Sequence, residues 1–300
     1  MLDEPTRALL ARIAEAGGRP AHEAGPAEAR AAMRERQRAN PPGPGVSRVE
    51  DVRIPGADGA GIPARVFVPE DSRAVAVFLH GGGWVLGDLD GFDHYGRRLA
   101  VALRATVVMP DYRLAPEHPH PAALEDALAA VAWASAALPD GPLLVVGESS
   151  GGNLAAAVAR ASDAAGIALA AQVLVYPVLD ADFARPSYLD PENQLLVDAT
   201  AMRWFWDQYV PDAARRSAPA ASPLRGRLDG LPPTVLATAE HDVLRDEGEE
   251  YARLLAEAGV PVTSRRFDGQ MHGFATMPAL PASAELLEHL AHEVDALLRP

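Results

Sequence analysis

From residue 75 to the C-terminus, strand-like segments alternate with segments of helical periodicity. The strand-like segments span residues 75–79, 106–109, 143–146, 170–176, 234–238 and 261–267, and the helical ones span 121–138, 152–165, 246–258 and 282–298. Most of these strands are apolar along their length, which is typical of strands buried on both faces of a parallel sheet. The alternation therefore predicts an α/β fold, in which helices cover both sides of a mainly parallel central sheet.

The part of the chain before residue 75 has a different pattern. Two further strands are predicted at 49–54 and 64–68, where apolar and polar residues alternate, with a turn at 56–61 between them. Residues 1–38 have a helical pattern, and the Pro- and Gly-rich stretch 40–45 follows as a strong break and a domain boundary.

One long segment interrupts the α/β alternation. Residues 180–222 contain no clear strand, although they hold several aromatic side chains. An insertion of this length in a compact α/β fold usually has a function and often forms a lid. We therefore expect a core built from residues 46–179 and 223–300, with 180–222 as an insertion.

Composition excludes several kinds of chemistry. The 300-residue chain has no Cys, so it forms no disulfide, no thiolate metal site and no cysteine nucleophile. Its formal net charge of -14 argues against a nucleic-acid partner. No apolar run reaches the roughly 18 residues of a membrane span, and the N-terminus lacks a signal-peptide layout. We therefore expect a cytoplasmic protein. No phosphate loop or dinucleotide motif is present, so no cofactor is implied, and no metal is expected.

A candidate nucleophile lies in the segment 147–151, which has the sequence Gly-Glu-Ser-Ser-Gly. An apolar strand leads into this segment and an Ala-rich helix follows it, which is the strand–turn–helix setting of a nucleophile elbow. Ser149 is the predicted nucleophile, and the helix after it directs its N-terminal amides toward a developing oxyanion. Ser150 is the alternative nucleophile. The alternative interpretation of the whole motif is a structural turn between strand and helix in which the serine has no catalytic role.

Three consecutive glycines follow the strand 75–79 directly, in the segment 80–84 with the sequence His-Gly-Gly-Gly-Trp. Backbone without side chains can direct several N–H groups toward one anionic oxygen, although a flexible glycine hinge is the simpler alternative. We predict that Gly82 and Gly83, with the amide of Ser150, form an oxyanion hole. His80 is expected to steady this loop by hydrogen bonding.

Four ordered motifs resemble those of the bacterial hormone-sensitive-lipase-like esterases, the family IV carboxylesterases of the α/β-hydrolase superfamily. They are residues 80–84, Tyr-Arg-Leu-Ala-Pro-Glu at 112–117, residues 147–152, and Met-His-Gly-Phe at 271–274. The resemblance implies an α/β-hydrolase core with a helical cap made of residues 1–45 and 180–222. The chain departs from the family's usual pattern at Glu148 and Ser150, where Asp or Thr and then Ala are common, and at Val243, where Pro often follows the acid.

The base follows from the triad order of α/β-hydrolases, which is Ser, then acid, then His. Downstream of the elbow, His289 and His292 lie on an amphipathic terminal helix and are expected at the surface. His241 precedes every plausible acid except Glu240. His272 lies in a Gly-containing loop just after the strand 261–267, so it is the predicted base.

The acid follows from the same order. Asp242 lies just after the strand 234–238, at the end of the sheet where a catalytic loop is expected, and the family pattern also falls on it. Asp268 is an alternative that shares one short loop with His272, and Glu240 is close enough to stay an alternative on sequence alone. Glu117 is expected to make structural hydrogen bonds beneath the site.

Together these residues predict a carboxylic-ester hydrolase that forms an acyl-enzyme and acts on a small-molecule ester. The resemblance implies a preference for short to medium acyl chains and allows a homodimer through an edge strand or the last helices. Aromatic residues are candidates for the substrate pocket, and we single out Trp84, Trp204, Trp206 and Phe274. An amide hydrolase of the arylformamidase type and a small-molecule binding protein are the alternative functions.

Overall fold

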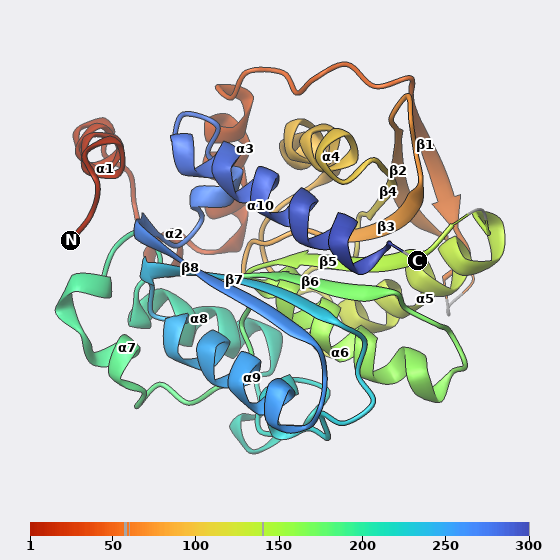
Figure 1. Cartoon of the computed structure of the whole chain (residues 1–300). Coiled ribbons are helices and arrows are strands. Elements are labelled where there is room, and N and C mark those ends of the chain that lie inside the picture. The colour runs from red at the N-terminus through yellow and green to blue at the C-terminus, as the bar shows by residue number, and fades with distance from the viewer. Residues whose placement is uncertain (57–58, 60, 140, 300) are drawn as a thin grey trace.

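The computed structural model describes residues 1–56, 59, 61–139 and 141–299, and in this part of the chain eight strands form one sheet (Figure 1). The strand order is β1-β2-β4-β3-β5-β6-β7-β8, and β2 runs antiparallel to both of its neighbours, whereas the strands from β4 to β8 are parallel. The strands are β1 (Arg48–Ile54), β2 (Ile62–Val68), β3 (Ala74–Leu79), β4 (Ala105–Pro110), β5 (Leu143–Glu148), β6 (Ala171–Val175), β7 (Thr234–His241) and β8 (Val262–Met271). The predicted mainly parallel sheet is therefore confirmed.

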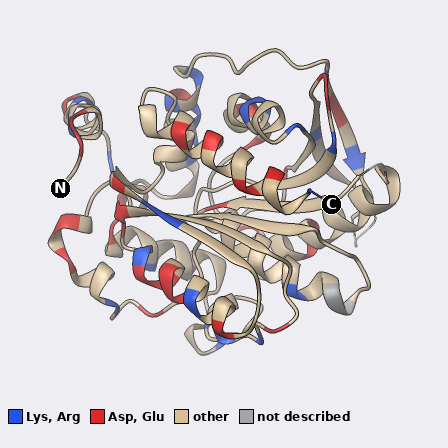
Figure 2. Ribbon diagram, in the orientation of Figure 1, with Lys and Arg blue, Asp and Glu red and all other residues tan. Residues whose placement is uncertain are grey.

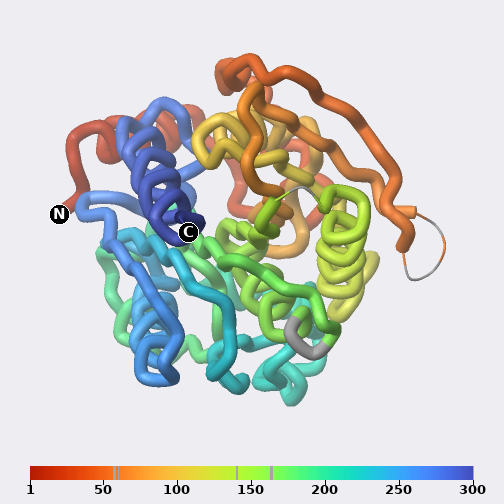
Figure 3. The backbone as a smooth tube through the Cα atoms, turned by 45° about the vertical axis from the view of Figure 1, so that its right-hand side comes forward, coloured from red at the N-terminus to blue at the C-terminus, as the bar shows by residue number. Residues whose placement is uncertain are grey.

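Helices cover both faces of this sheet. They are α1 (Glu4–Ala16), α2 (Ala21–Ala24), α3 (Pro26–Arg38), α4 (Leu89–Leu103), α5 (Ala122–Ala137), α6 (Ser150–Ala164), α7 (Pro186–Leu189), α8 (Ala199–Tyr209), α9 (Arg245–Glu257) and α10 (Pro281–Leu297). Helices α4 and α10 contribute to the buried cluster on one face, and α5, α6, α8 and α9 to the cluster on the other (Figure 1). Strands β1 and β2 form one side of the molecule, as both the ribbon (Figure 1) and the turned backbone tube (Figure 3) show.

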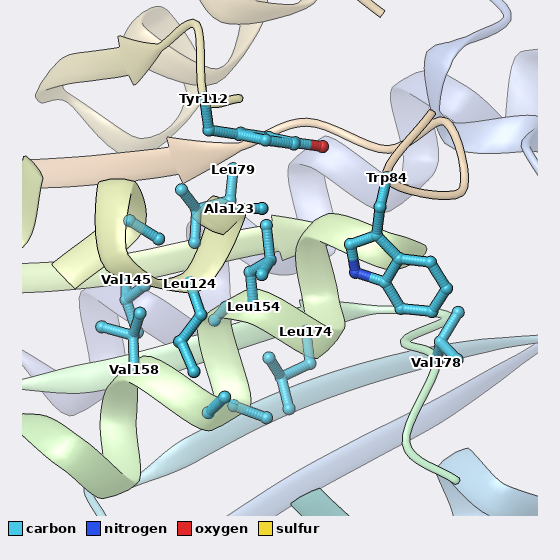
Figure 4. Close-up of a cluster of buried hydrophobic side chains, with 14 of the residues drawn as sticks. Leu79, Trp84, Tyr112, Ala123, Leu124, Val145, Leu154, Val158, Leu174 and Val178 are labelled. Carbon is cyan, nitrogen blue, oxygen red and sulfur yellow. The ribbon is translucent and has the colours of Figure 1, made fainter. Parts of the chain in front are cut away.

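The central strands are buried on both faces because neighbouring residues point to opposite sides of the sheet. Every residue of β3, β4 and β5 is buried. On one face, Leu79 and Val145 join Leu154 and Val158 of α6 in a single apolar cluster (Figure 4). Phe78, one residue before Leu79, belongs to the cluster on the opposite face. Charged residues lie mostly on the helices and edge strands, and the central strands carry few (Figure 2).

The predicted ends of two strands were wrong. Strand β7 runs on to His241 and β8 to Met271, because the two strands keep pairing through an irregularity between Ala239 and His241. The sequence pattern predicts that these strands end at residues 238 and 267, because the polar residues that follow are typical of loops. As a result, each strand leads directly into a predicted catalytic residue rather than into a longer loop.

Helix α4 was not predicted, because two glycines within it weaken the helical signal. Asp88 caps the helix, with its Oδ1 atom accepting the N–H of Gly91 at 2.8 Å. Gly96 lies against strand β2, and a Cβ atom there would be 2.5 Å from the ring of Phe67. The glycine that lowers helix propensity is therefore the residue that lets this helix pack closely on the sheet.

In the two segments predicted to lie outside the core, 1–45 and 180–222, the secondary-structure elements are all helical. Residues 1–38 form α1, α2 and α3, as predicted, and the described insertion 180–222 contains helices and turns without a strand. Helix α2 contacts α8, so the N-terminal segment and the insertion meet. The turn predicted at 56–61 falls largely outside the described residues, which omit 57, 58 and 60. None of the helices in the described ranges is both long and apolar enough to cross a membrane.

Candidate active site

Ser149 lies in a sharp turn between β5 and α6. Its backbone φ of 57° is in the left-handed region, which is strained for a residue with a side chain. The two flanking glycines allow this turn: a Cβ atom on Gly147 would be 2.1 Å from the carbonyl oxygen of Gly151, and one on Gly151 would be 1.9 Å from that of Leu79. The Ser149 N–H also donates to Val175 O at 2.9 Å, which ties the turn to β6. The surrounding backbone therefore holds the serine in its strained conformation.

The structure brings Ser149, His272 and Asp242 together at the carboxyl ends of β5, β8 and β7. Ser149 Oγ lies 2.8 Å from His272 Nε2, and His272 Nδ1 lies 2.7 Å from Asp242 Oδ2. With the imidazole proton on Nδ1, His272 donates to the carboxylate and accepts the serine hydroxyl proton. Because parallel strands end at one edge of the sheet, three residues far apart in the sequence form one continuous hydrogen-bonded chain.

The alternative acids lie elsewhere in the structure. Asp242 is fully buried, and its second oxygen, Oδ1, accepts the N–H of Leu244 at 2.9 Å. Glu240 accepts the N–H of Gly269 at 2.7 Å, and Asp268 is exposed. Both oxygens of Asp242 are therefore used, one to orient the base and one to shape its own loop.

His272 has a pKa above that of an exposed histidine. Burial lowers the pKa of its imidazole, but the charge and hydrogen bond of Asp242, together with the charge of Glu148, outweigh burial and raise it. Glu148 is itself buried beside Ser149, and burial raises the pKa of its carboxyl group. A histidine of this kind is suited to accept a proton from a neighbouring hydroxyl group and to return it later.

The glycine loop after β3 is held in an unusual backbone conformation. Gly82, Gly83 and Trp84 have φ values of 118°, 61° and 59°, and the N–H groups of Val85 and Leu86 both donate to Gly82 O, at 3.1 and 2.9 Å. Within the described part of the chain, no acceptor takes the N–H of Gly82, Gly83 or Ser150. These three N–H groups are the donors predicted for the oxyanion hole.

His80 anchors the start of this loop. Its ring is fully buried between those of Phe92 and Tyr112, at centroid distances of 4.9 and 4.4 Å. Its Nδ1 atom lies 2.8 Å from Gly81 O, and the Tyr112 hydroxyl donates to His80 O at 2.7 Å. The hydrogen bonding expected of His80 is present, and burial lowers its pKa to about 4.

Three of the four singled-out aromatic residues pack among other aromatic rings. Trp84 stacks on Tyr209 with ring centroids 4.1 Å apart and contacts Trp206 edge-on at 5.1 Å, and neither tryptophan has exposed surface (Figure 4 shows Trp84). Phe274 is buried on the opposite side of the sheet, against Tyr176 and Phe267.

The fourth residue, Trp204, is half-buried and packs against Phe205, with ring centroids 5.0 Å apart. Phe205 covers the glycine loop, because a Cβ atom on Gly83 would lie 2.1 Å from its ring. The aromatic residue over the glycine loop is thus Phe205, and helical periodicity alone does not distinguish it from its two tryptophan neighbours.

Two other expectations were wrong in part. Glu117 makes the structural hydrogen bonds expected of it, with Arg30 of α3, but its side chain is 54% exposed and does not lie beneath the site. His289 is only partly exposed, because its ring packs edge-on against Phe267 and pairs with Glu293, whereas His292 is exposed as expected. Among the described residues, no group of three or more His, Asp or Glu side chains is arranged to hold a metal ion.

Residues that support the site without a sequence motif were missed. Ser187 of α7 donates its hydroxyl to Val243 O at 2.6 Å, and its N–H donates to Asp246 Oδ2 at 2.8 Å, so the insertion holds the loop that carries Asp242. The ring of Tyr176 lies 4.6 Å from that of His272. Neither residue belongs to a recognisable sequence motif, because each acts on a residue that is distant from it in the sequence.

Comparison with known proteins agrees with this geometry. A family model described as alpha/beta hydrolase fold matches residues 76–276. The carboxylesterase NlhH of Mycobacterium tuberculosis is 41% identical over 253 residues, which cover 79% of each chain. The chain belongs to the hormone-sensitive-lipase-like carboxylesterases.

Other members of this carboxylesterase family extend the comparison. An ethyl acetate hydrolase of Pseudomonas putida is 38% identical and covers 83% of this chain and 82% of its own. The crystal structure of a thermostable esterase from Pseudomonas putida superposes with a TM-score of 0.91 at 36% identity, over 100% of this chain and 98% of the other. The predicted family, the α/β-hydrolase fold and the enzyme class, a carboxylic-ester hydrolase, are therefore confirmed.

The low pKa of His80 makes stability depend on pH. Between about pH 6.5 and 4, the unfolded chain binds a proton that the folded chain does not, so the stabilisation from neutral His80 is complete above pH 6.5 and declines toward pH 4. We expect this residue to lower the free energy of unfolding by about 3 kcal/mol across that range. Urea unfolding of the wild type at a series of pH values measures the change.

The His80→Phe variant isolates this contribution, because phenylalanine fits between the rings of Phe92 and Tyr112 and does not titrate. Its free energy of unfolding should vary less steeply with pH than that of the wild type, and His292→Phe, at an exposed position, should leave the slope unchanged. Equal slopes for His80→Phe and the wild type would contradict the prediction.

Proposed function

We propose that the protein hydrolyses carboxylic esters through an acyl-enzyme on Ser149, with His272 as general base and acid and Asp242 as its orienting partner. The observation that carries this proposal is the hydrogen-bonded chain from Ser149 Oγ to His272 Nε2, 2.8 Å, and from His272 Nδ1 to Asp242 Oδ2, 2.7 Å. A nucleophile, a base and a group that fixes the base's tautomer are the parts that acyl transfer needs.

In the first half of the reaction, Ser149 Oγ attacks the ester carbonyl carbon while His272 Nε2 takes the hydroxyl proton. The carbonyl oxygen becomes an oxyanion and accepts hydrogen bonds from the N–H groups of Gly82, Gly83 and Ser150. The intermediate then collapses, and His272 donates its proton to the leaving alcohol. In the second half, the same histidine activates water, which releases the acid and restores the serine.

We assign residues 1–45 and 180–222 to a cap above the core of 46–179 and 223–300. The contact between α2 and α8 supports this assignment, since it joins the two segments to each other. The substrate is a small ester with a short to medium acyl chain, since Phe205 of α8 packs onto the oxyanion loop and limits the space beside it. The homodimer stays a prediction from the sequence.

Hydrolysis of p-nitrophenyl esters from acetate to palmitate tests the reaction. The wild type should turn over the shorter esters fastest, and Ser149→Ala should lower kcat by about 10⁶-fold, because it removes the nucleophile. Ser217→Ala, which changes an exposed serine, is the control for purification and folding. Turnover that survives Ser149→Ala but not Ser150→Ala would move the nucleophile to Ser150, and activity confined to aryl amides would favour the amidase alternative.

The pH dependence tests the base. Since the pKa of His272 is raised above 6.5 and only the neutral imidazole accepts a proton, kcat/KM should fall as the pH decreases through a value above 6.5. In Asp242→Asn, burial lowers the pKa of His272 without the opposing charge of Asp242, so the fall of kcat/KM at acidic pH should move to lower pH. The same variant should lower kcat by about 10⁴-fold. A fall that stays at the wild-type pH in Asp242→Asn would show that Asp242 does not control the titration of His272.

The chain-length profile tests the role of Phe205. Replacing its ring with a methyl group opens space beside Gly83, so Phe205→Ala should raise kcat/KM for decanoate relative to acetate by about tenfold. Leu189→Ala, which truncates an exposed side chain on α7, should leave the ratio unchanged. A wild-type profile in Phe205→Ala would place the limit on acyl length elsewhere.

A further inference from the structure

Arg30 of α3 binds the oxyanion loop directly. Its Nε atom donates to Val85 O at 2.7 Å, and its Nη2 atom donates to Ala115 O at 2.8 Å. The same guanidinium binds both carboxylate oxygens of Glu117, at 2.8 and 2.6 Å. One side chain from the N-terminal segment therefore holds the two core loops that flank the site.

Val85 belongs to the turn that sets the glycine conformations. Its N–H donates to Gly82 O at 3.1 Å, while its carbonyl oxygen accepts from Arg30, so both sides of this residue are fixed. Trp84 O accepts the N–H of Ala115 at 2.9 Å, and Ala115 O accepts from Arg30 in turn. The contacts of Arg30 thus close a ring of hydrogen bonds through Trp84, Val85 and Ala115, and the N–H of Val85 links this ring to Gly82 O.

The guanidinium is well placed to keep this geometry during turnover. The side chain of Arg30 is 19% exposed, and its planar group matches the carboxylate in a paired geometry that a lysine does not reproduce. Arg30 also lowers the pKa of Glu117 to about 2, so this carboxylate stays charged over the pH range in which His272 is neutral.

We propose that Arg30 is a positioning residue for ester hydrolysis, which holds the N–H groups of Gly82 and Gly83 in place through the carbonyl oxygen of Val85. The inference rests on the proposed oxyanion hole. It makes the N-terminal segment part of the catalytic apparatus, and it separates two roles of the guanidinium: the carbonyl contacts set the oxyanion loop, whereas the Glu117 pair holds α3 on the core.

Kinetics of four variants on p-nitrophenyl butyrate test this division. Arg30→Ala should lower kcat by about ten- to hundredfold, because misplaced donors stabilise the transition state less, and should change KM by less than about threefold. Glu117→Gln keeps the two carbonyl contacts and should keep kcat within about twofold. Arg34→Ala removes an arginine one turn further along α3, 46% exposed and 3.8 Å from Asp88, and should match the wild type. Arg30→Lys, which retains the charge, should lie between Arg30→Ala and the wild type.

Thermal unfolding of each variant separates positioning from stabilisation. A loss of Tm in Arg30→Ala with a wild-type kcat for the folded enzyme would overturn the inference, and so would equal losses of kcat in Arg30→Ala and Glu117→Gln. If Arg30→Ala does not fold, a wild-type kcat in Arg30→Lys overturns it as well. A wild type inactive on every ester would instead overturn the proposed function, and the inference with it.

Discussion

The close packing of backbone around Ser149 is the constraint on which the site depends. The serine keeps a left-handed conformation because Gly147 and Gly151 let the end of β5, the start of α6 and the end of β3 approach without side chains between them. A side chain at either glycine would meet backbone atoms at about 2 Å, and backbone cannot rotate away as a flexible side chain can. This contact also joins the proposed nucleophile to the proposed oxyanion loop, because that loop begins where β3 ends.

The parallel sheet then supplies the other groups. Strands β7 and β8 end beside the elbow, and each leads directly into a residue of the hydrogen-bonded chain, Asp242 and His272. Three residues of the segments assigned to the cap contact loops of the site: Ser187 bonds the loop of Asp242, Arg30 bonds the loop that follows Gly82, and Phe205 covers Gly83. In the proposed mechanism, the core therefore supplies the reacting groups, and the segments assigned to the cap set the loop geometry and the space for substrate.

Much of this arrangement was predictable because it has local signals. Apolar runs predicted the buried strands, and glycines at strand ends predicted the elbow with Ser149 and the oxyanion loop. The triad order then pointed to His272 and Asp242, with Glu240 and Asp268 as alternatives for the acid. Helix α4 was not predicted because Gly96 lowers the helical propensity of its sequence, and this glycine is there because only a residue without a side chain fits against Phe67. Arg30 and Phe205 were not singled out for a related reason: their partners are distant in the sequence, and periodicity does not identify the loop that a side chain contacts.

The central claim is that Ser149 and the N–H groups of Gly82, Gly83 and Ser150 form one site prepared for a tetrahedral oxyanion. The most direct measurement is a crystal structure of the protein after reaction with diethyl p-nitrophenyl phosphate, whose adduct resembles that intermediate. The account predicts a single adduct on Ser149 Oγ, with the phosphoryl oxygen within about 3.1 Å of the nitrogens of Gly82, Gly83 and Ser150. An adduct on another residue, or a phosphoryl oxygen directed away from these nitrogens, would contradict it.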